Sequence, residues 1–425
     1  MNIISKLLGL LYLLYPYQDI SIFISIVKPY YIAFIAMLIS FVFLKFCKKK
    51  LKLIFKFFFL YIIFILFIIA SIFWSINQEE STFYYIKYLV YFLMGFSLSV
   101  YISHNPASIF YIIRSIYVSA IIVSLVYIYK FISMEGLDIL LFENPSMETI
   151  AQIASINVGF GGGRNLFASW LAFSLTFALP IMISTYKNIR LLLIPTSIIM
   201  IIPLVLTLSR TALLSLIVFG FLIIIFTEDK KLKMTAIKII GVLFSTITLM
   251  VIFNIFNIGS FFITRFYLIF ESFQGESVDY GVMGRLELWH YAIKSIIEYP
   301  ILGTGIGTLY KGWKEIGGVH NYHNIFLQFW AQLGIIGLSI FILWSIFLIY
   351  ISYKTYKKLR KFSHSRLYYL SFITFLNINI YYFKSLLMFQ YFDLEIWTLI
   401  GITGGLFAIV YSGGFKWEEK VKYAY

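Results

Sequence analysis

Residues 324–352 read NIFLQFWAQLGIIGLSIFILWSIFLIYIS, an apolar run without Asp, Glu, Lys or Arg. About 20 such residues cross a bilayer as an α-helix, in which every backbone polar group is satisfied internally. The run is therefore predicted to span a membrane. Comparable runs recur along the chain and predict an all-α, polytopic transmembrane bundle of about twelve helices, at residues 7–27, 30–46, 53–74, 84–103, 107–133, 166–186, 190–208, 211–227, 234–256, 324–352, 365–388 and 393–412.

The composition agrees with a membrane protein. Hydrophobic residues make up 61% of the 425 and charged residues only 12%, against about 25% charged residues in ordinary soluble domains. A soluble fold would have no place for this apolar surface. The single cysteine, Cys47, excludes an internal disulfide and a cysteine metal site. The apolar stretch after Lys6 has no small-residue cleavage pattern, so we expect a retained first helix.

The net charge of +15 would indicate nucleic acid in a soluble protein, but here topology explains it, and we expect no nucleic-acid partner. Basic residues gather in the gaps after the second, sixth, eighth and tenth predicted helices and in the tail. They are Lys48–Lys50 and Lys52, Lys187 and Arg190, Lys230, Lys231 and Lys233, Lys354 to Arg366, and Lys416 to Lys422. The positive-inside rule then places both termini in the cytoplasm. We expect one transmembrane domain, residues 1–425, in which segment 257–323 lies on the opposite face as short helices between the ninth and tenth spans.

Three arginines on that opposite face are not required by the topology. Arg164, Arg210 and Arg285 each lie near apolar segments, where an arginine is costly unless it is paired, hydrated or snorkelling. The planar guanidinium can bond two phosphate oxygens at once, so each is a candidate for binding an anion. The alternatives are a snorkelling interfacial arginine or a structural pair with Glu287 or Asp279.

Two of the five histidines lie close together, in His320-Asn-Tyr-His323-Asn324, where the long segment meets the tenth helix. A neutral imidazole can accept a proton from a sugar hydroxyl. At a helix start the positive dipole end disfavours the imidazolium, so His323 suits a general base. The alternatives are an interfacial histidine without a role and a zinc site, for which further ligands are missing; we predict no metal.

Two groups of glycines are interpreted as packing devices. Gly303, Gly305 and Gly307 follow no predicted strand, so they indicate a tight turn instead of a phosphate loop. Gly334 and Gly337 are expected to allow close contact between helices.

Together these motifs resemble the O-antigen ligase family, which includes O-antigen ligases and related polysaccharide polymerases. The signature is His323-Asn324, nine residues, then Gly334-Ile-Ile-Gly337. The resemblance covers roughly residues 160–345 and also includes the segment Ser209-Arg210-Thr211-Ala212 and a block made up of Gly284, Arg285, Trp289, Ala292, Pro300, Gly303 and Gly305. The family often has an acidic residue just before Gly-x-x-Gly, where this chain has Gln332-Leu333.

The resemblance implies a glycan transferase of the bacterial inner membrane that works without metal, nucleotide or other cofactor, with its site on the periplasmic face. The donor would be a glycan on undecaprenyl diphosphate, and the acceptor a sugar hydroxyl of a lipid A core or of a second lipid-linked glycan. Arg210 and Arg285 would hold the diphosphate, and His323 would take the proton, with inversion at the donor carbon. The supporting residues, which are less specific, would be Arg164, Asn324, His320 and Asp393. In place of Gln332, Asp393 or Glu395 could orient the histidine.

The motifs leave three alternatives open. A polymerase would share the base and the diphosphate clamp with a ligase, and the lead goes to the ligase because the His-Asn block is best known there. A transporter or lipid flippase would place its polar residues near the midplane and in two matching halves, whereas the candidates gather at one face. A structural subunit without chemistry leaves the ordered set of two arginines and a histidine unexplained.

Overall fold

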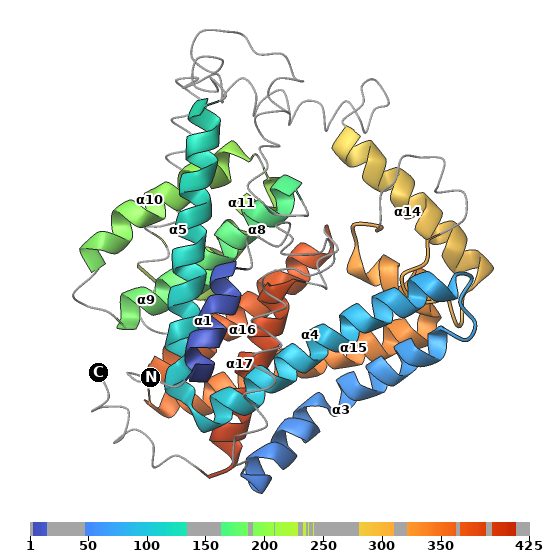
Figure 1. Cartoon of the computed structure of the whole chain (residues 1–425), viewed down its shortest axis with the longest axis horizontal. Coiled ribbons are helices and arrows are strands. Elements are labelled where there is room, and N and C mark those ends of the chain that lie inside the picture. Colours follow the sequence, from blue (N-terminus) through green and yellow to red (C-terminus); the bar gives the residue numbers. More distant parts are fainter. Residues whose placement is uncertain are drawn as a thin grey trace. The chain divides into compact units, whose positions relative to one another are not determined.

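The computed structural model describes residues 3–14, 47–133, 163–185, 190–207, 209–227, 280–309, 321–362, 366–387 and 393–413, and single positions between 233 and 241. The regular structure of these residues is entirely helical (Figure 1). Six of these stretches are long and apolar enough to cross a membrane: Lys48–Ser71, Gln78–His104, Pro106–Ser133, Asn165–Met182, Ile325–Leu359 and Leu394–Tyr411. The predicted all-α transmembrane class is confirmed. The total of about twelve spans stays a prediction, and 30–46 and most of 234–256 lie outside the described residues.

The chain divides into two compact units. The first contains Met1–Leu10, Ile32–Ile113 and Arg285–Tyr425, and the second Leu11–Tyr31 and Arg114–Gly284. Each unit is described by itself, so the expected single transmembrane domain stays a prediction. The short helix α1 (Ile3–Leu14) crosses the boundary between them.

The core of the first unit is aromatic. It is built from α3 (Lys48–Ser71), α4 (Gln78–His104), α15 (Ile325–Leu359), α16 (Arg366–Ser385) and α17 (Leu394–Tyr411). Tyr61 of α3 lies between two buried indoles, with ring centroids 5.4 Å from Trp344 and 5.1 Å from Trp397. Such tilted and edge-on contacts add to the stabilisation from apolar burial.

Small residues bring α4 and α17 close together. A Cβ on Gly95 would lie 2.7 Å from the indole of Trp397, and one on Gly401 would lie 2.6 Å from Leu98. The Ser99 hydroxyl donates to the carbonyl of Gly401 at 3.0 Å. This is the close backbone approach that small residues permit between membrane helices.

Helix α4 begins six residues before the apolar run that predicted it. Asn77 is the N-cap, and its Oδ1 accepts from the backbone N–H of Glu80 at 3.2 Å. Glu79 and Glu80 lie in the first turn, where the helix dipole favours negative charge. Capping therefore extends this helix beyond its apolar part.

The second unit contains α5 (Ile109–Ser133) from Arg114 onward, α8 (Gly163–Phe173), a π-helical turn (Ser174–Ala178), α9 (Leu179–Thr185), α10 (Arg190–Leu206) and α11 (Arg210–Phe226). Trp170 donates its indole N–H to Ser119 at 3.2 Å, which ties α8 to α5. The Tyr117 hydroxyl lies 2.7 Å from that of Thr196 on α10. These elements match the predicted runs 107–133, 166–186, 190–208 and 211–227.

One long helix of the first unit is broken. Gly334 in α15 has φ +63° and ψ −171°, a conformation that glycine adopts readily and other residues rarely do. The expected helix–helix contact therefore holds for Gly337, whose Cβ would lie 2.9 Å from Phe67 of α3, but not for Gly334. A Cβ on Gly334 would instead lie 2.0 Å from the carbonyl oxygen of Ile301.

The loop that occupies this break runs over residues 299–308, which follow α14 (Tyr280–Glu298). The N–H of Ile335 donates to the Pro300 carbonyl at 3.0 Å, and the N–H of Gly305 donates to the Gln332 carbonyl at 2.8 Å. The loop thus satisfies backbone groups that the broken helix leaves open. Gly303, Gly305 and Gly307 all have positive φ, which confirms the predicted tight turn.

Basic side chains gather at the other end of the first unit. Lys358, near the end of α15, lies with its ammonium 4.1 Å from the ring centroid of Tyr411, at the end of α17. Lys49, at the start of α3, has its ammonium 3.9 Å from where a Cβ of Gly413 would be. The basic starts and ends of these helices therefore share one end of the unit, while the 299–308 loop and the start of α15 lie at the opposite end.

Candidate functional site

His323 lies immediately before the N-cap of α15, with its backbone in the left-handed region at φ 51°. The cap is Asn324, whose Oδ1 accepts from the N–H groups of Phe326 and Leu327 at 3.0 and 3.1 Å. The Asn324 amide also donates to the carbonyl of Leu386, just beyond α16, at 3.1 Å. Asn324 therefore fixes the start of α15 and joins it to the residue after α16. These contacts explain why an asparagine follows the histidine.

The residue before the histidine is held on both sides. The carbonyl of Tyr322 accepts from the indole N–H of Trp289 at 3.0 Å, and its N–H donates to the Gln328 side chain at 2.7 Å. The Tyr322 ring is 1% exposed and packs in an apolar cluster with Leu288 and Ala292 of α14. The helix that carries Arg285 is thereby fixed to the backbone beside His323.

The electrostatics of the site follow from this placement. Burial of the imidazole, and second the positive charge of Arg285, lower the pKa of His323 to about 4. The ring is therefore neutral near pH 7, as the sequence predicted. The expected reason was the helix dipole, whereas burial is the largest cause. A partly buried arginine beside a neutral imidazole can bind an anion while the imidazole accepts a proton.

Gln332 shows why this chain departs from the acidic pattern before Gly-x-x-Gly. Its side chain is 2% exposed, and its Nε2 donates to the carbonyl of Thr308 at 2.8 Å. A carboxylate accepts hydrogen bonds and cannot donate to a carbonyl. Gln332 therefore holds the 299–308 loop against the break in α15.

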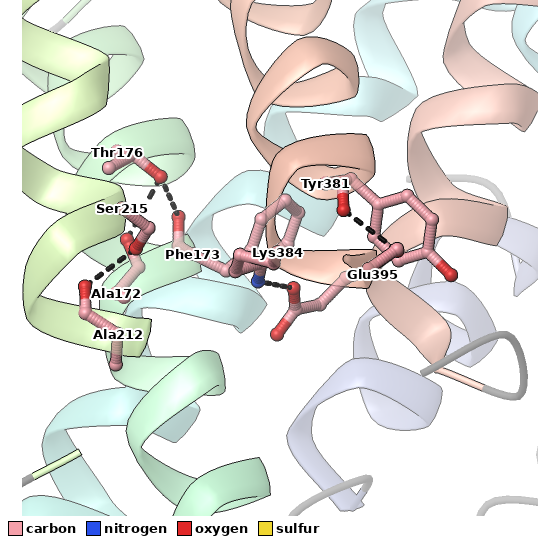
Figure 2. Close-up of polar contacts among 9 residues, drawn as sticks. Ala172, Phe173, Thr176, Ala212, Ser215, Tyr381, Lys384 and Glu395 are labelled. Atoms are coloured by element: carbon pink, nitrogen blue, oxygen red, sulfur yellow. Dashed lines mark hydrogen bonds and ion pairs between the residues drawn. The ribbon is translucent and has the colours of Figure 1, made fainter. Parts of the chain in front are cut away.

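The sequence analysis did not identify the buried ion pair between α16 and α17. Lys384 and Glu395 lie 2.7 Å apart, and both side chains are 4% exposed (Figure 2). The available signal was a lysine inside the apolar run 365–388, followed by an acidic residue at the start of the next helix. The Glu395 carboxylate accepts a hydrogen bond from the Lys384 ammonium and neutralises its charge. Its predicted part in orienting the histidine stays a prediction.

The remaining predicted site residues lie on separate elements. Arg210, partly buried, is the first residue of α11, and Arg164 is the second of α8, both in the second unit. Asp393 is the N-cap residue of α17 and is 5% exposed. His320 lies outside the described residues. Within the first unit, Arg285 lies near enough to His323 for its charge to lower the pKa of the imidazole. A common site that also includes Arg210 stays a prediction.

These features define a class, a helical membrane protein of several spans that carries a neutral imidazole and a guanidinium at one end of its helices. A sequence model of O-antigen ligase matches residues 195–342, which include Arg210, Arg285 and His323. The resemblance seen in the motifs is thereby confirmed: residues 195–342 are similar to the O-antigen ligase family. This similarity supports the interpretation of the protein as a membrane enzyme that transfers lipid-linked glycan. A search of curated protein sequences finds no match.

Proposed function

We propose that the protein is an inverting, metal-independent glycosyltransferase of the bacterial inner membrane. It moves a glycan from undecaprenyl diphosphate to a sugar hydroxyl, on a lipid A core as an O-antigen ligase does. The observation that carries the proposal is the pair of Arg285 and His323, in which a cation acts on a partly buried, neutral imidazole.

In the proposed reaction, His323 accepts the proton of the acceptor hydroxyl. The acceptor oxygen forms a bond to the donor's anomeric carbon, while the bond from that carbon to the diphosphate oxygen breaks. The electron pair leaves with undecaprenyl diphosphate, whose developing charge Arg285 and Arg210 stabilise. Attack opposite the leaving group inverts the configuration. Loss of one preorganised donor of this kind typically raises a barrier by about 2.7–4 kcal/mol.

The bound diphosphate would also raise the pKa of His323. Its negative charge offsets the repulsion from Arg285, which is the second cause of the low pKa of His323. The imidazole is therefore a stronger proton acceptor when the donor is present than in the free enzyme. Binding of the diphosphate therefore favours proton transfer to His323.

The orientation rests on the basic end of the first unit. Lys49 and Lys358 lie at the end opposite His323. Basic residues favour the cytoplasmic side, which supports a periplasmic location for His323 and Arg285 and cytoplasmic termini.

A polysaccharide polymerase of the same family is the second candidate, because the same base and clamp serve an acceptor that is itself lipid-linked. A transporter or lipid flippase is disfavoured, since Arg285 and His323 lie at one end of the helices of the first unit and not at their middle. A flippase predicts movement of lipid-linked glycan without a new glycosidic bond, so the transfer assay separates the two.

The test is glycan transfer in proteoliposomes with a lipid-linked donor and either acceptor. His323→Ala should abolish transfer, whereas His290→Ala, an exposed histidine on α14, should leave it intact. Arg285→Lys should lower the rate because lysine lacks the bidentate fork, whereas Lys294→Arg on the exposed face of the same helix should not. Full transfer by His323→Ala, or inhibition by EDTA that a divalent metal reverses, would contradict the proposal.

A further inference from the structure

Helix α14 has three distinct faces from Arg285 onward. Leu288, Ala292, Ser295 and Ile296 are buried against the protein. Glu287, Lys294 and Glu298 are exposed and charged. Leu286, Ile293 and Ile297 are apolar and yet 40%, 48% and 74% exposed. The last two sets have the same i, i+7, i+11 spacing, shifted by one residue, so each forms its own stripe along the helix.

We call Leu286, Ile293 and Ile297 the apolar stripe. It continues beyond the helix, because Ile301 and Leu302 in the following loop are 60% and 41% exposed. A helix between protein and water would place polar residues all along such a stripe, whereas along this one the exposed polar residue is His290 alone, between Leu286 and Ile293. The exposed surface of α14 instead has an apolar stripe beside a charged one, as in helices that lie in a membrane interface.

The loop after α14 is fixed to the end of a membrane span. The indole N–H of Trp74 donates to the Leu302 carbonyl at 3.1 Å, and the N–H of Ile76 donates to the Thr304 carbonyl at 3.0 Å. Both donors lie just beyond the end of α3, which is long and apolar enough to cross a bilayer. Leu302 is therefore held beside the end of α3.

The surface of α3 itself faces lipid up to that point. Phe55, Phe59 and Leu66 are 50%, 60% and 57% exposed, and Phe73, next to Trp74, is 83% exposed. Exposed aromatic and aliphatic side chains along a span contact acyl chains. The exposed apolar surface thus runs from α3 through Ile301 and Leu302 to the apolar stripe.

We infer that the apolar stripe of α14 enters the membrane leaflet at this end of the spans, with lipid acyl chains as its partner. The charged stripe of Glu287, Lys294 and Glu298 then faces water. Arg285 lies three, seven and eleven residues before the buried Leu288, Ala292 and Ile296, so it shares their face of α14. The inferred placement of the helix brings it near the lipid phosphate groups. Only this last consequence rests on the proposed function, since it presents the guanidinium to a lipid-linked diphosphate as it arrives from the leaflet.

The chain offers a direct test, because Cys47 is its only cysteine and Cys47→Ser gives a cysteine-free background. Single cysteines carry a nitroxide in proteoliposomes of phosphatidylethanolamine and phosphatidylglycerol. Collision rates are measured with oxygen, which concentrates in lipid, and with a water-soluble nickel chelate. The stripe variants are Leu286→Cys, Ile293→Cys and Ile297→Cys, and the matched controls are Glu287→Cys, Lys294→Cys and Glu298→Cys.

The ratio of oxygen to nickel collisions should be several-fold higher at each stripe position than at the control one residue later. Nickel-favoured collisions at all six positions would show that the stripe lies in water and overturn the inference. Low collision rates with both reagents at the stripe would show that protein covers it, which would also overturn the inference. Three independent pairs keep the test valid if one variant misfolds. The labels report lipid contact whether or not glycan transfer is detected, so failure here is distinguishable from failure of the proposed function.

Discussion

Lowering the pH from 7.5 to 5.5 should leave glycan transfer by the wild-type protein almost unchanged. The pKa of His323 is lowered to about 4 by burial and, second, by the charge of Arg285. With that pKa, about 3% of the rings carry a proton at pH 5.5, whereas about nine in ten would at the ordinary pKa of about 6.5. A base with the ordinary value would therefore lose about nine-tenths of its activity over this interval.

The assay is the initial rate at subsaturating donor, measured in proteoliposomes from pH 4.5 to 8. Under these conditions the rate follows kcat/KM, which reports the pKa of the free enzyme. Transfer should fall only as the pH approaches 4. Arg285→Met removes the repulsion from the imidazolium, so its residual activity should fall at a higher pH than in the wild type, while burial keeps that pH below 6.5. Lys294→Met is the matched control and should not shift the profile. A wild-type profile centred near pH 6.5, or an unshifted one in Arg285→Met, would refute this reasoning.

The remaining predictions concern the scaffold, and thermal unfolding in detergent tests each. Gly334→Ala should destabilise the protein by more than about 1–3 kcal/mol, the cost of a backbone conformation essentially restricted to glycine, because its Cβ would also lie 2.0 Å from a loop carbonyl. Gly241→Ala has open space around it; equal effects would be inconsistent with the break in α15. Lys384→Met should destabilise by about 3–5 kcal/mol, since it leaves the Glu395 charge buried and unpaired, and the double change with Glu395→Leu should recover most of the loss; no recovery would argue against the pair as its cause. Gln332→Glu should cost about 1–3 kcal/mol because it removes the donor to a buried carbonyl, and wild-type stability in this variant would disprove that role.

The helices were predictable where apolar length alone determines them. The run 324–352 predicts α15, and 393–412 predicts α17, because a bilayer requires long stretches without charge. The start of α4 was placed too late, since its first turn is polar and is stabilised by Asn77. Hydropathy does not register capping.

The sequence pattern did not predict the break at Gly334. Gly-x-x-Gly in an apolar run is typical of close helix packing. Only the position of the 299–308 loop shows that Gly334 instead makes room for a loop carbonyl. The contact of Trp289 with Tyr322 likewise joins residues 33 apart in sequence. Such contacts depend on tertiary structure, which local periodicity does not specify.

For the candidate site, the structure bears on one predicted property, the charge of His323. The sequence predicted a neutral His323, and the pKa of about 4 agrees. It did not single out Lys384, whose partner Glu395 lies on the next helix and is identified only by the tertiary structure. The grouping of Arg210 with Arg285 and the roles of Arg164 and Asp393 stay predictions.

The most direct test of the account is a structure of the protein in lipid nanodiscs with an undecaprenyl-diphosphate-linked glycan bound. The account predicts the diphosphate within hydrogen-bond distance of Arg285 and Arg210, and the anomeric carbon facing His323, at the end of the spans away from Lys49 and Lys358. A diphosphate bound at the basic end, or one that leaves Arg285 and His323 without contact to the donor, would contradict it.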